Sequence, residues 1–242
     1  MANLRGRDRE RYVARMFGRI ACHYDRLNTI MTFGRHQAWR RLATEFVCAQ
    51  GICGPVLDVA TGTGDFAIEL ARKHGVSEVV GLDFTRQMLP IAVRKTKDGG
   101  HEGNIQYVVG DAHTLPFPDN TFVAVTVGFG VRNFVDVPVA IKEVLRVLKP
   151  GGRIAILEIV RMERRRILDR LFVSGFRILA PWLGMIFASD REAYTYLPES
   201  VRGFLTVGGL VNLIGEAGFC QVVVKQMALG SVAIVIGEKA DR

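Results

Sequence analysis

The sequence predicts an α/β fold with a mostly parallel β-sheet. Between residues 56 and 158, short runs of β-branched residues alternate with helical segments, a rhythm typical of βαβ units. The last two predicted strands are separated only by Leu229-Gly230, which is too short for a crossover, so this pair must be antiparallel. The chain has 242 residues, 49% apolar and 23% charged, which suits a folded domain and excludes a disordered chain or a coiled coil.

Each element follows from its own pattern. Apolar residues at helical spacing predict two helices within residues 11–47, with a break around Asn28 to Gly34. The segment Arg161–Ser200 departs from the later strand–helix rhythm and looks like an insertion. The predicted strands are Val56–Ala60, Glu78–Leu82, Ile105–Val109, Phe122–Val127, Arg153–Glu158, Gln221–Ala228 and Ser231–Glu238. The predicted helices between them are Asp65–His74, Thr85–Lys97, Val137–Leu148 and Val207–Ala217.

Positive charge is concentrated at the start of the chain. The net charge is +8, and residues 1–41 hold ten arginines against three acidic residues. A basic leading segment indicates an anionic partner, such as nucleic acid, an acidic lipid surface or a phosphate-bearing ligand, or else a solvated helical arm. Nucleic acid is the weakest of these because only Tyr12, Phe17 and Tyr24 are interleaved with the arginines.

Other signals exclude several classes of protein. The four cysteines form no C-x-x-C pair and the five histidines have no ligand spacing with them, so we expect neither a metal site nor disulfides. The N-terminus lacks the apolar region of a signal peptide, which favours a cytoplasmic location. The apolar run Ile178–Ala188 is too short to span a membrane, and we expect a core helix or a pocket wall there, with membrane-interface contact as the alternative.

A glycine turn follows the first predicted strand and opens a helix, where residues 56–65 read VLDVATGTGD. Glycines at this point allow positive φ and let a ligand approach backbone N–H groups closely. The pattern Gly62-x-Gly64-x-x-Ala67 fits the dinucleotide fingerprint. By itself it leaves nicotinamide cofactors and other adenosyl ligands open.

Acidic residues end the next two strands. Asp83 stands where a carboxylate can accept hydrogen bonds from ribose hydroxyls, although it could also cap the next helix. Asp111, within the GDA motif at 110–112, can reach an adenine edge, and both acids meet at one edge of a parallel sheet. Asp58 and Asp65 add negative charge near the turn, which favours a cationic adenosyl ligand, S-adenosylmethionine, over a pyrophosphate.

These motifs resemble those of the class I S-adenosylmethionine-dependent methyltransferases, whose Rossmann-like sheet has seven mostly parallel strands and an antiparallel C-terminal strand. A closer resemblance, over about residues 12–238, is to the ubiquinone/menaquinone biosynthesis C-methyltransferases. The motifs that carry it are Phe17-x5-His23-Tyr24-Asp25-x2-Asn28-x2-Met31, Gly34-x-His36-x2-Trp39-Arg40, Phe129-Gly130-Val131-Arg132-Asn133 and Ala193-Tyr194-x-Tyr196-Leu197-Pro198-Glu199-Ser200.

The resemblance implies an enzyme with two parts. Residues 1–48 are expected to form a helical N-terminal lid and substrate segment, and residues 49–242 the S-adenosylmethionine-binding domain, with a substrate-side insertion at 161–200. The expected reaction is C-methylation of a polyprenyl hydroquinone, and the main hypothesis for the substrate is demethylmenaquinol, which is converted to menaquinol. The alternative is a methyltransferase for another aromatic or lipid-like molecule.

The resemblance also implies roles for individual residues. Arg132 is expected to stabilise a phenolate and Asn133 to orient a hydroxyl or a water. Asp25, His36 or a water held by Arg132 is expected to take the proton, with a structural role as the alternative for His36. A structural ion pair with an acid is the simpler alternative for Arg132. The expected cofactor-binding residues are Asp58, Gly62, Thr63, Gly64, Asp83, Asp111, Ala112 and Gly128. The expected substrate residues are Tyr24, Tyr194 and Tyr196, and no metal is expected.

A polyprenyl substrate further implies contact with a membrane. The basic N-terminus is expected to hold the protein on anionic lipid, and the apolar segment Leu171–Phe187 to guide the isoprenoid tail. We therefore expect a cytoplasmic protein, peripheral on the inner face of the cell membrane, without a nucleic-acid partner. The oligomeric state stays open, with a homodimer among the expectations.

Overall fold

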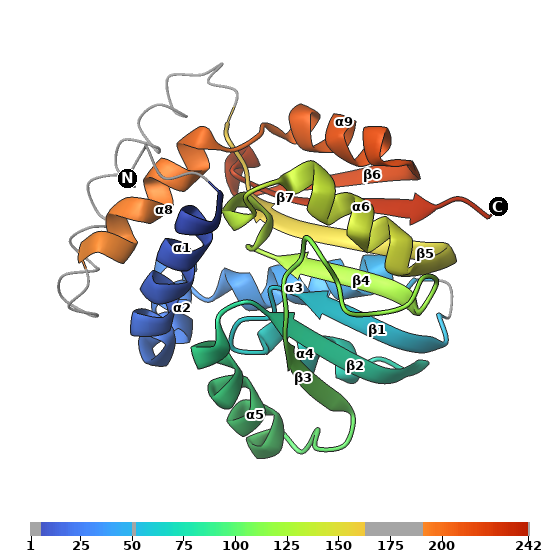
Figure 1. Cartoon of the computed structure of the whole chain (residues 1–242), viewed down its shortest axis with the longest axis horizontal. Coiled ribbons are helices and arrows are strands. Elements are labelled where there is room, and N and C mark those ends of the chain that lie inside the picture. The colour runs from blue at the N-terminus through green and yellow to red at the C-terminus, as the bar shows by residue number, and fades with distance from the viewer. Residues whose placement is uncertain (1–5, 50–51, 163–190, 242) are drawn as a thin grey trace.

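A seven-stranded sheet with the order β3-β2-β1-β4-β5-β7-β6 forms the centre of the computed structural model, which describes residues 6–49, 52–162 and 191–241 (Figure 1). Strands β1 to β5 are parallel, and β7 is antiparallel to both β5 and β6, as predicted. The strands are β1 Gly54–Val59, β2 Val76–Asp83, β3 Ile105–Val109, β4 Phe122–Gly128, β5 Leu148–Ile159, β6 Phe219–Met227 and β7 Val232–Lys239. The chain reverses direction along the sheet between β1 and β4, where open α/β sheets bind ligands.

Helices cover both faces of this sheet. On one face, α6 (Val137–Val147) and α9 (Val207–Ala217) bury their apolar sides against the strands, and on the other face α3 (Arg35–Val47) and α4 (Asp65–Ala71) do so. The helix α5 (Leu89–Asp98) packs beside β3. Side-chain caps set where α6 and α9 begin, because Asp136 and Thr206 accept backbone N–H groups of their first turns.

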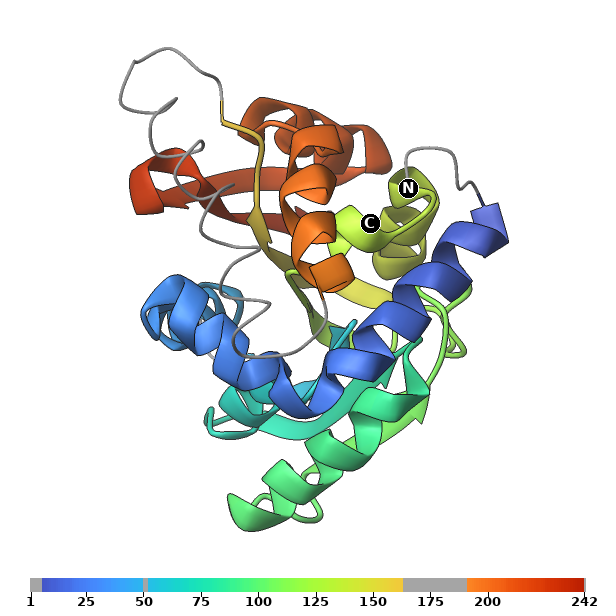
Figure 2. The same cartoon turned by 90° about the vertical axis from the view of Figure 1, so that its left-hand side faces the viewer.

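Three further helices form a cover beside the carboxyl ends of the strands. They are α1 (Gly6–Ile20), α2 (Tyr24–Thr32) and α8 (Arg191–Gly203), and they lie together at one side of the molecule (Figures 1 and 2). Val13, Met16, Leu27 and Tyr196 make a small core of their own between these helices. Since α3 is packed on the sheet, we restrict the proposed lid to α1 and α2.

Two sequence expectations need correction here. The break expected around Asn28 to Gly34 is confined to Phe33 and Gly34, because α2 continues to Thr32, and the sequence did not predict the further interruption at Ala21–His23. The hydroxyls of Thr29 and Thr32 donate to carbonyls one turn earlier, which accommodates these polar residues within the helix. The end of the insertion is helical, as α8, although it reads as irregular in the sequence. The segment Leu171–Phe187 lies outside the described residues.

Candidate active site

A first cavity, which we call the cofactor cavity, lies at the carboxyl ends of β1, β2, β3 and β4. It brings together five of the residues predicted to bind the cofactor, and α1 and α2 close it with Val13, Phe17 and Tyr24. The five are Gly62, Asp83, Asp111, Ala112 and Gly128. Four strand ends in one lining match the expectation of a single nucleoside pocket.

Asp83 organises the wall of this cavity. Its two carboxylate oxygens accept the backbone N–H groups of Gly62 and Thr85, each at 2.7 Å. Burial raises the pKa of Asp83, and these hydrogen bonds partly oppose that effect. Gly62 has φ of +57°, a conformation that favours glycine. Each carboxylate oxygen keeps a second lone pair, so Asp83 can still accept bonds from ligand hydroxyls.

Asp111 is hydrogen-bonded to His113 and lies near Glu10 of α1. One of its oxygens accepts the backbone N–H of His113 at 2.9 Å and lies 2.6 Å from the ring Nδ1 of the same residue. The other ring nitrogen accepts the backbone N–H of Asp136, so Nδ1 carries the proton. Glu10, on α1, lies 3.7 Å from His113 Nδ1. Hydrogen bonds thus join Asp111, His113 and the start of α6, and Glu10 of α1 lies beside them.

Three other predicted cofactor residues are not among the described residues that line this cavity. Asp58 is buried below it, where the hydroxyls of Thr61 and Thr126 donate to its carboxylate at 2.6 and 2.7 Å. Burial raises the pKa of Asp58 to about 6. Thr63 is buried, and Gly64 has φ of +82° where a Cβ would collide with Tyr107. The structure therefore gives these residues contacts that shape the turn.

A second cavity, the central cavity, adjoins the first and shares Phe17, Tyr24 and Phe129 with it. Arg132 lines it from the short helix Val131–Asn133 that follows β4. The guanidinium Nη1 of Arg132 is paired with Glu158 and also donates to the carbonyl of Phe129 at 2.8 Å. Both charged side chains are buried, at 5% and 0% exposure, so each compensates the other's charge.

Two residues that line the central cavity each have a side-chain donor without a partner among the described residues. The donors are Nε of Arg132 and the amide Nδ2 of Asn28, and both atoms are buried. Buried polar groups in folded proteins are nearly always hydrogen-bonded, and an unpaired one costs about 1–3 kcal/mol.

The two predicted proton carriers are engaged elsewhere. Asp25 accepts from the hydroxyl of Thr63 and pairs with Lys95 at 2.6 Å, and Lys95 also pairs with Asp65. This network fastens α2 to the glycine turn and to α5. Burial raises the pKa of Asp65, but the cations Arg40 and Lys95 outweigh it and hold that pKa below its usual value.

His36 lines the central cavity but has both ring nitrogens occupied. Arg40 donates to Nδ1 at 2.5 Å, so the proton is on Nε2, which donates to Thr29 at 3.1 Å. Burial and then the charge of Arg40 lower the pKa of His36 to about 4. The imidazole is therefore neutral at neutral pH and has no free lone pair for a proton.

Tyrosines connect the cover to the site. The hydroxyl of Tyr196 donates to Oδ1 of Asn133 at 3.0 Å, and Asn133 itself lines the cofactor cavity. Tyr24 lines both the cofactor and the central cavity. Tyr194 lies on α8, and its side chain is outside the described residues.

A third cavity, the outer cavity, adjoins the central one and shares Met31, Thr32 and Ile159 with it. Its volume is about 470 Å³, against about 70 Å³ for the central cavity. Trp39 and Val201 add apolar walls. The three cavities thus lie in a row from the glycine turn to Leu229, and neighbouring cavities share lining residues.

Sequence reasoning missed three residues of the site: Asn28, Lys95 and Glu158. Glu158 carried a signal, because it is an acid directly after the apolar run 154–157 and at the carboxyl edge of the sheet. Asn28 stands in a motif that the resemblance used, without a role attached. Lys95 had no signal beyond a basic residue near a helix end.

Comparison with known proteins shows which family the sequence matches. Residues 6–239 match the model of the ubiE/COQ5 methyltransferase family. A demethylmenaquinone methyltransferase of Anoxybacillus flavithermus is 41% identical, over 96% of this chain and 98% of the relative. A ubiquinone/menaquinone biosynthesis C-methyltransferase UbiE of Saccharophagus degradans is 39% identical, over 96% of this chain and 93% of the relative.

Solved structures support the fold. A methyltransferase of Thermotoga maritima, described as a possible histamine N-methyltransferase, aligns with a TM-score of 0.66 at 19% identity, over 93% of this chain and 99% of that one. A phosphoethanolamine N-methyltransferase of Haemonchus contortus, in complex with S-adenosylhomocysteine, aligns at 0.59 and 16% identity, over 83% of this chain and 52% of that one. Together with the family match over nearly the whole sequence, this shows that the chain belongs to the ubiE/COQ5 methyltransferase family.

Proposed function

We propose that this S-adenosylmethionine-dependent C-methyltransferase acts on the ring of a polyprenyl hydroquinone, with demethylmenaquinol as the main substrate. The observation that carries the proposal is a pair of buried donors, Arg132 Nε and Asn28 Nδ2, which have no partner among the described residues and belong to two residues that line the central cavity. This cavity lies between the cofactor cavity and a large apolar one. An oxygen-bearing aromatic ring with an apolar tail matches that series.

The residues of the cofactor cavity suit S-adenosylmethionine. Asp83 offers acceptors for the ribose hydroxyls, and Gly128 has no room for a side chain, since a Cβ there would lie 2.8 Å from Phe66. Asp111 and Ala112 line the part where we place the adenine. When bound, the cofactor supplies an electrophilic methyl group.

In the central cavity, Arg132 has the main chemical task. Its Nε and the amide of Asn28 donate to one ring oxygen, and they bind the phenolate more strongly than the phenol because the acceptor is then charged. Ionisation raises the electron density at the neighbouring ring carbon, which is the atom that attacks. That carbon then carries both the new methyl group and its hydrogen, and loss of this hydrogen as a proton to water restores the aromatic ring. Glu158 holds the guanidinium in position through Nη1 and leaves Nε for the substrate.

We propose water as the acceptor of the phenolic proton. Among the described residues, His36 has its lone pair engaged by Arg40, and Asp25 is engaged by Thr63 and Lys95. Asp25 and Lys95 instead hold α2 against the glycine turn, which keeps bulk water away from the reacting atoms. Asn133, oriented by the hydroxyl of Tyr196, can direct such a water.

The outer cavity is proposed to hold the first part of the polyprenyl tail. The tail also implies peripheral contact with a membrane, and the structure contains no membrane-spanning helix among residues 6–49, 52–162 and 191–241.

The names of the relatives include both demethylmenaquinone and ubiquinone/menaquinone biosynthesis, which supports a quinone substrate and leaves the ring type to experiment. The test is methyl transfer from labelled S-adenosylmethionine to a demethylated naphthoquinol and a benzoquinol, side by side. We expect label in the naphthoquinol. Label in the benzoquinol alone would move the enzyme to the ubiquinone branch. No label in either, with cofactor binding intact, would overturn the proposed substrate.

A further inference from the structure

Two bulky apolar side chains are exposed at the rim of the outer cavity. Phe33, between α2 and α3, is 91% exposed, and Leu229, in the turn between β6 and β7, is 75% exposed. Both line the same cavity, although they are far apart in the sequence. In Figure 2 the red β6–β7 turn and the blue helices α2 and α3 lie on the same side of the molecule.

The backbone makes these two residues unusual. Phe33 has φ of +50° and Leu229 has φ of +58°, the left-handed region that favours glycine and asparagine. Single exposed hydrophobic residues are normal on protein surfaces. At Phe33 and Leu229, exposure to water and a positive φ both disfavour a large apolar side chain. Both residues nevertheless line the same opening. Local strain of this kind is found where the strained residue meets a ligand or partner.

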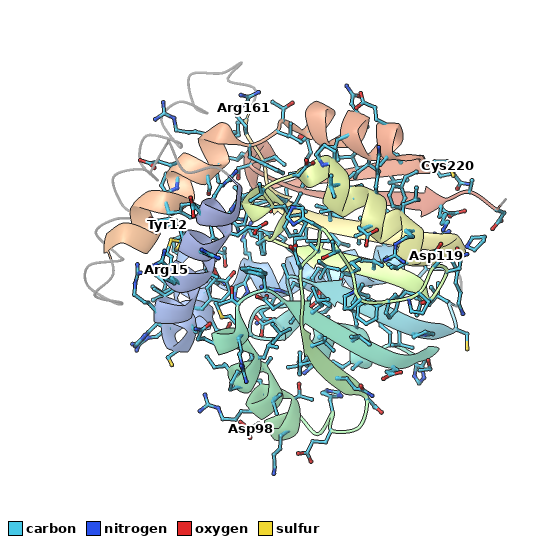
Figure 3. The ribbon with its side chains drawn as sticks, viewed as in Figure 1. Tyr12, Arg15, Asp98, Asp119, Arg161 and Cys220 are labelled. Atoms are coloured by element: carbon cyan, nitrogen blue, oxygen red, sulfur yellow. The ribbon has the colours of Figure 1, made fainter. Side chains whose placement is uncertain are left out.

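The charges around the opening define the partner's chemistry. Arg35, Arg161 and Arg202 are exposed and line the outer cavity, and its described lining contains no acidic residue. Figure 3 labels Arg161 at the margin of the molecule. Exposed apolar side chains and exposed arginines at one opening match a leaflet with anionic headgroups, because the apolar groups can enter the acyl boundary while the guanidinium groups stay at the headgroups.

We propose that this rim, formed by Phe33, Leu229, Arg35, Arg161 and Arg202, is the surface by which the protein docks on an anionic lipid bilayer. The inference deepens the proposed function, on which it rests in one respect: the mouth of the outer cavity then opens toward the leaflet that holds the polyprenyl tail. It assigns docking to the α2–α3 and β6–β7 junctions, in addition to the basic N-terminus expected from the sequence.

The test is flotation of the full chain with phosphatidylcholine vesicles, with and without phosphatidylglycerol. In the variant Phe33→Asn/Leu229→Asn, asparagine tolerates the left-handed backbone, so the melting temperature should stay the same or rise. Vesicle binding should fall roughly tenfold for each side chain, the order expected for withdrawing a phenylalanine or leucine from an apolar medium. Arg35→Gln/Arg202→Gln should weaken binding only to the phosphatidylglycerol vesicles.

The matched control is Val93→Gln on α5, where Val93 is 54% exposed. Asp98 marks the end of this helix, at the opposite end of the view from Arg161 in Figure 3. The control should bind vesicles as the wild type does. A double variant that floats like the wild type, or a wild type that does not bind anionic vesicles at low salt, would overturn the docking surface.

The outcome is separable from that of the proposed function. Rim-dependent vesicle binding without methyl transfer to any quinol would support the surface and overturn the substrate. Methyl transfer to a quinol, together with vesicle binding that is unchanged in the rim variants, would support the substrate and overturn the docking surface. A rim variant that loses binding to another protein, while vesicle binding is unchanged, would also overturn the lipid assignment.

Discussion

The cofactor cavity and the central cavity differ in how their polar groups are satisfied. In the cofactor cavity, both oxygens of Asp83 accept backbone N–H groups and Asp111 is bonded to His113. In the central cavity, Arg132 Nε and Asn28 Nδ2 are buried without a partner among the described residues. The carboxylates of the cofactor cavity are therefore hydrogen-bonded within the protein. In the central cavity, each unpaired donor lowers the free energy of unfolding by about 1–3 kcal/mol, and a ligand oxygen that accepts from it would remove this cost.

The sharpest way to test this contrast is Arg132→Lys, for which we expect the largest effect. Lysine keeps the positive charge opposite Glu158 but cannot present a donor at Nε while it stays paired. The turnover number should fall about 100-fold or more, the order found when one transition-state donor is removed. Affinity for S-adenosylhomocysteine, measured by calorimetry, should stay within about twofold. Full turnover would remove Arg132 as the stabiliser of the phenolate.

A second test concerns Asp58, whose burial raises its pKa to about 6 from 3.8. A carboxyl whose pKa is raised by folding contributes stability that is present below the unfolded pKa and lost as pH rises through the folded one. In Asp58→Asn this dependence disappears, so the variant should gain stability relative to the wild type by up to about 3 kcal/mol between about pH 4 and about pH 8. Urea unfolding at both pH values measures it, and a difference independent of pH would contradict the assignment.

Asn28→Leu should separate activity from stability. The variant removes a buried donor that has no partner, so without ligand its melting temperature should stay the same or rise. Methyl transfer should nevertheless fall about tenfold, because the ring oxygen loses one hydrogen bond of about 1.5 kcal/mol. A loss of both stability and activity would show that Asn28 has a structural partner, and would weaken the contrast between the two cavities.

The smallest effect on turnover is expected for His36→Asn. The side-chain oxygen of asparagine can accept the bond that Arg40 now gives to Nδ1. Since His36 has no free lone pair and a pKa of about 4, we expect turnover within about threefold of the wild type. A pH–rate profile should keep its shape as well. Loss of an acidic limb together with a large drop in turnover would restore His36 as the base.

Much of the cofactor cavity could be predicted because its parts are local. Gly62, Asp83 and Asp111 each stand at the end of a strand, and parallel strands bring their carboxyl ends to one edge without further information. The bounds of β3 and α9 match the sequence prediction to the residue. Asp58 shows the limit: its type and position were evident, but the hydroxyl of Thr126 that binds it comes from β4.

The central cavity could be predicted only in part because its contacts depend on register and on long-range packing. Glu158 reaches Arg132 because Gly128 of β4 pairs with Leu157 of β5, which brings the two strand ends together. The motifs of α2 and α3 identified Asp25 and His36 as residues of interest. They gave no indication of the bonds to Lys95 and Arg40 that occupy these side chains.

The most direct test is a crystal structure with S-adenosylhomocysteine and a demethylnaphthoquinol bound together. We predict a ring oxygen within about 3.2 Å of both Arg132 Nε and Asn28 Nδ2, with the tail entering the outer cavity beside Ile159. The unmethylated carbon beside that oxygen should face the cofactor cavity. A ring bound elsewhere, with both donors still unpaired, would contradict the assignment of the central cavity as the site of methyl transfer.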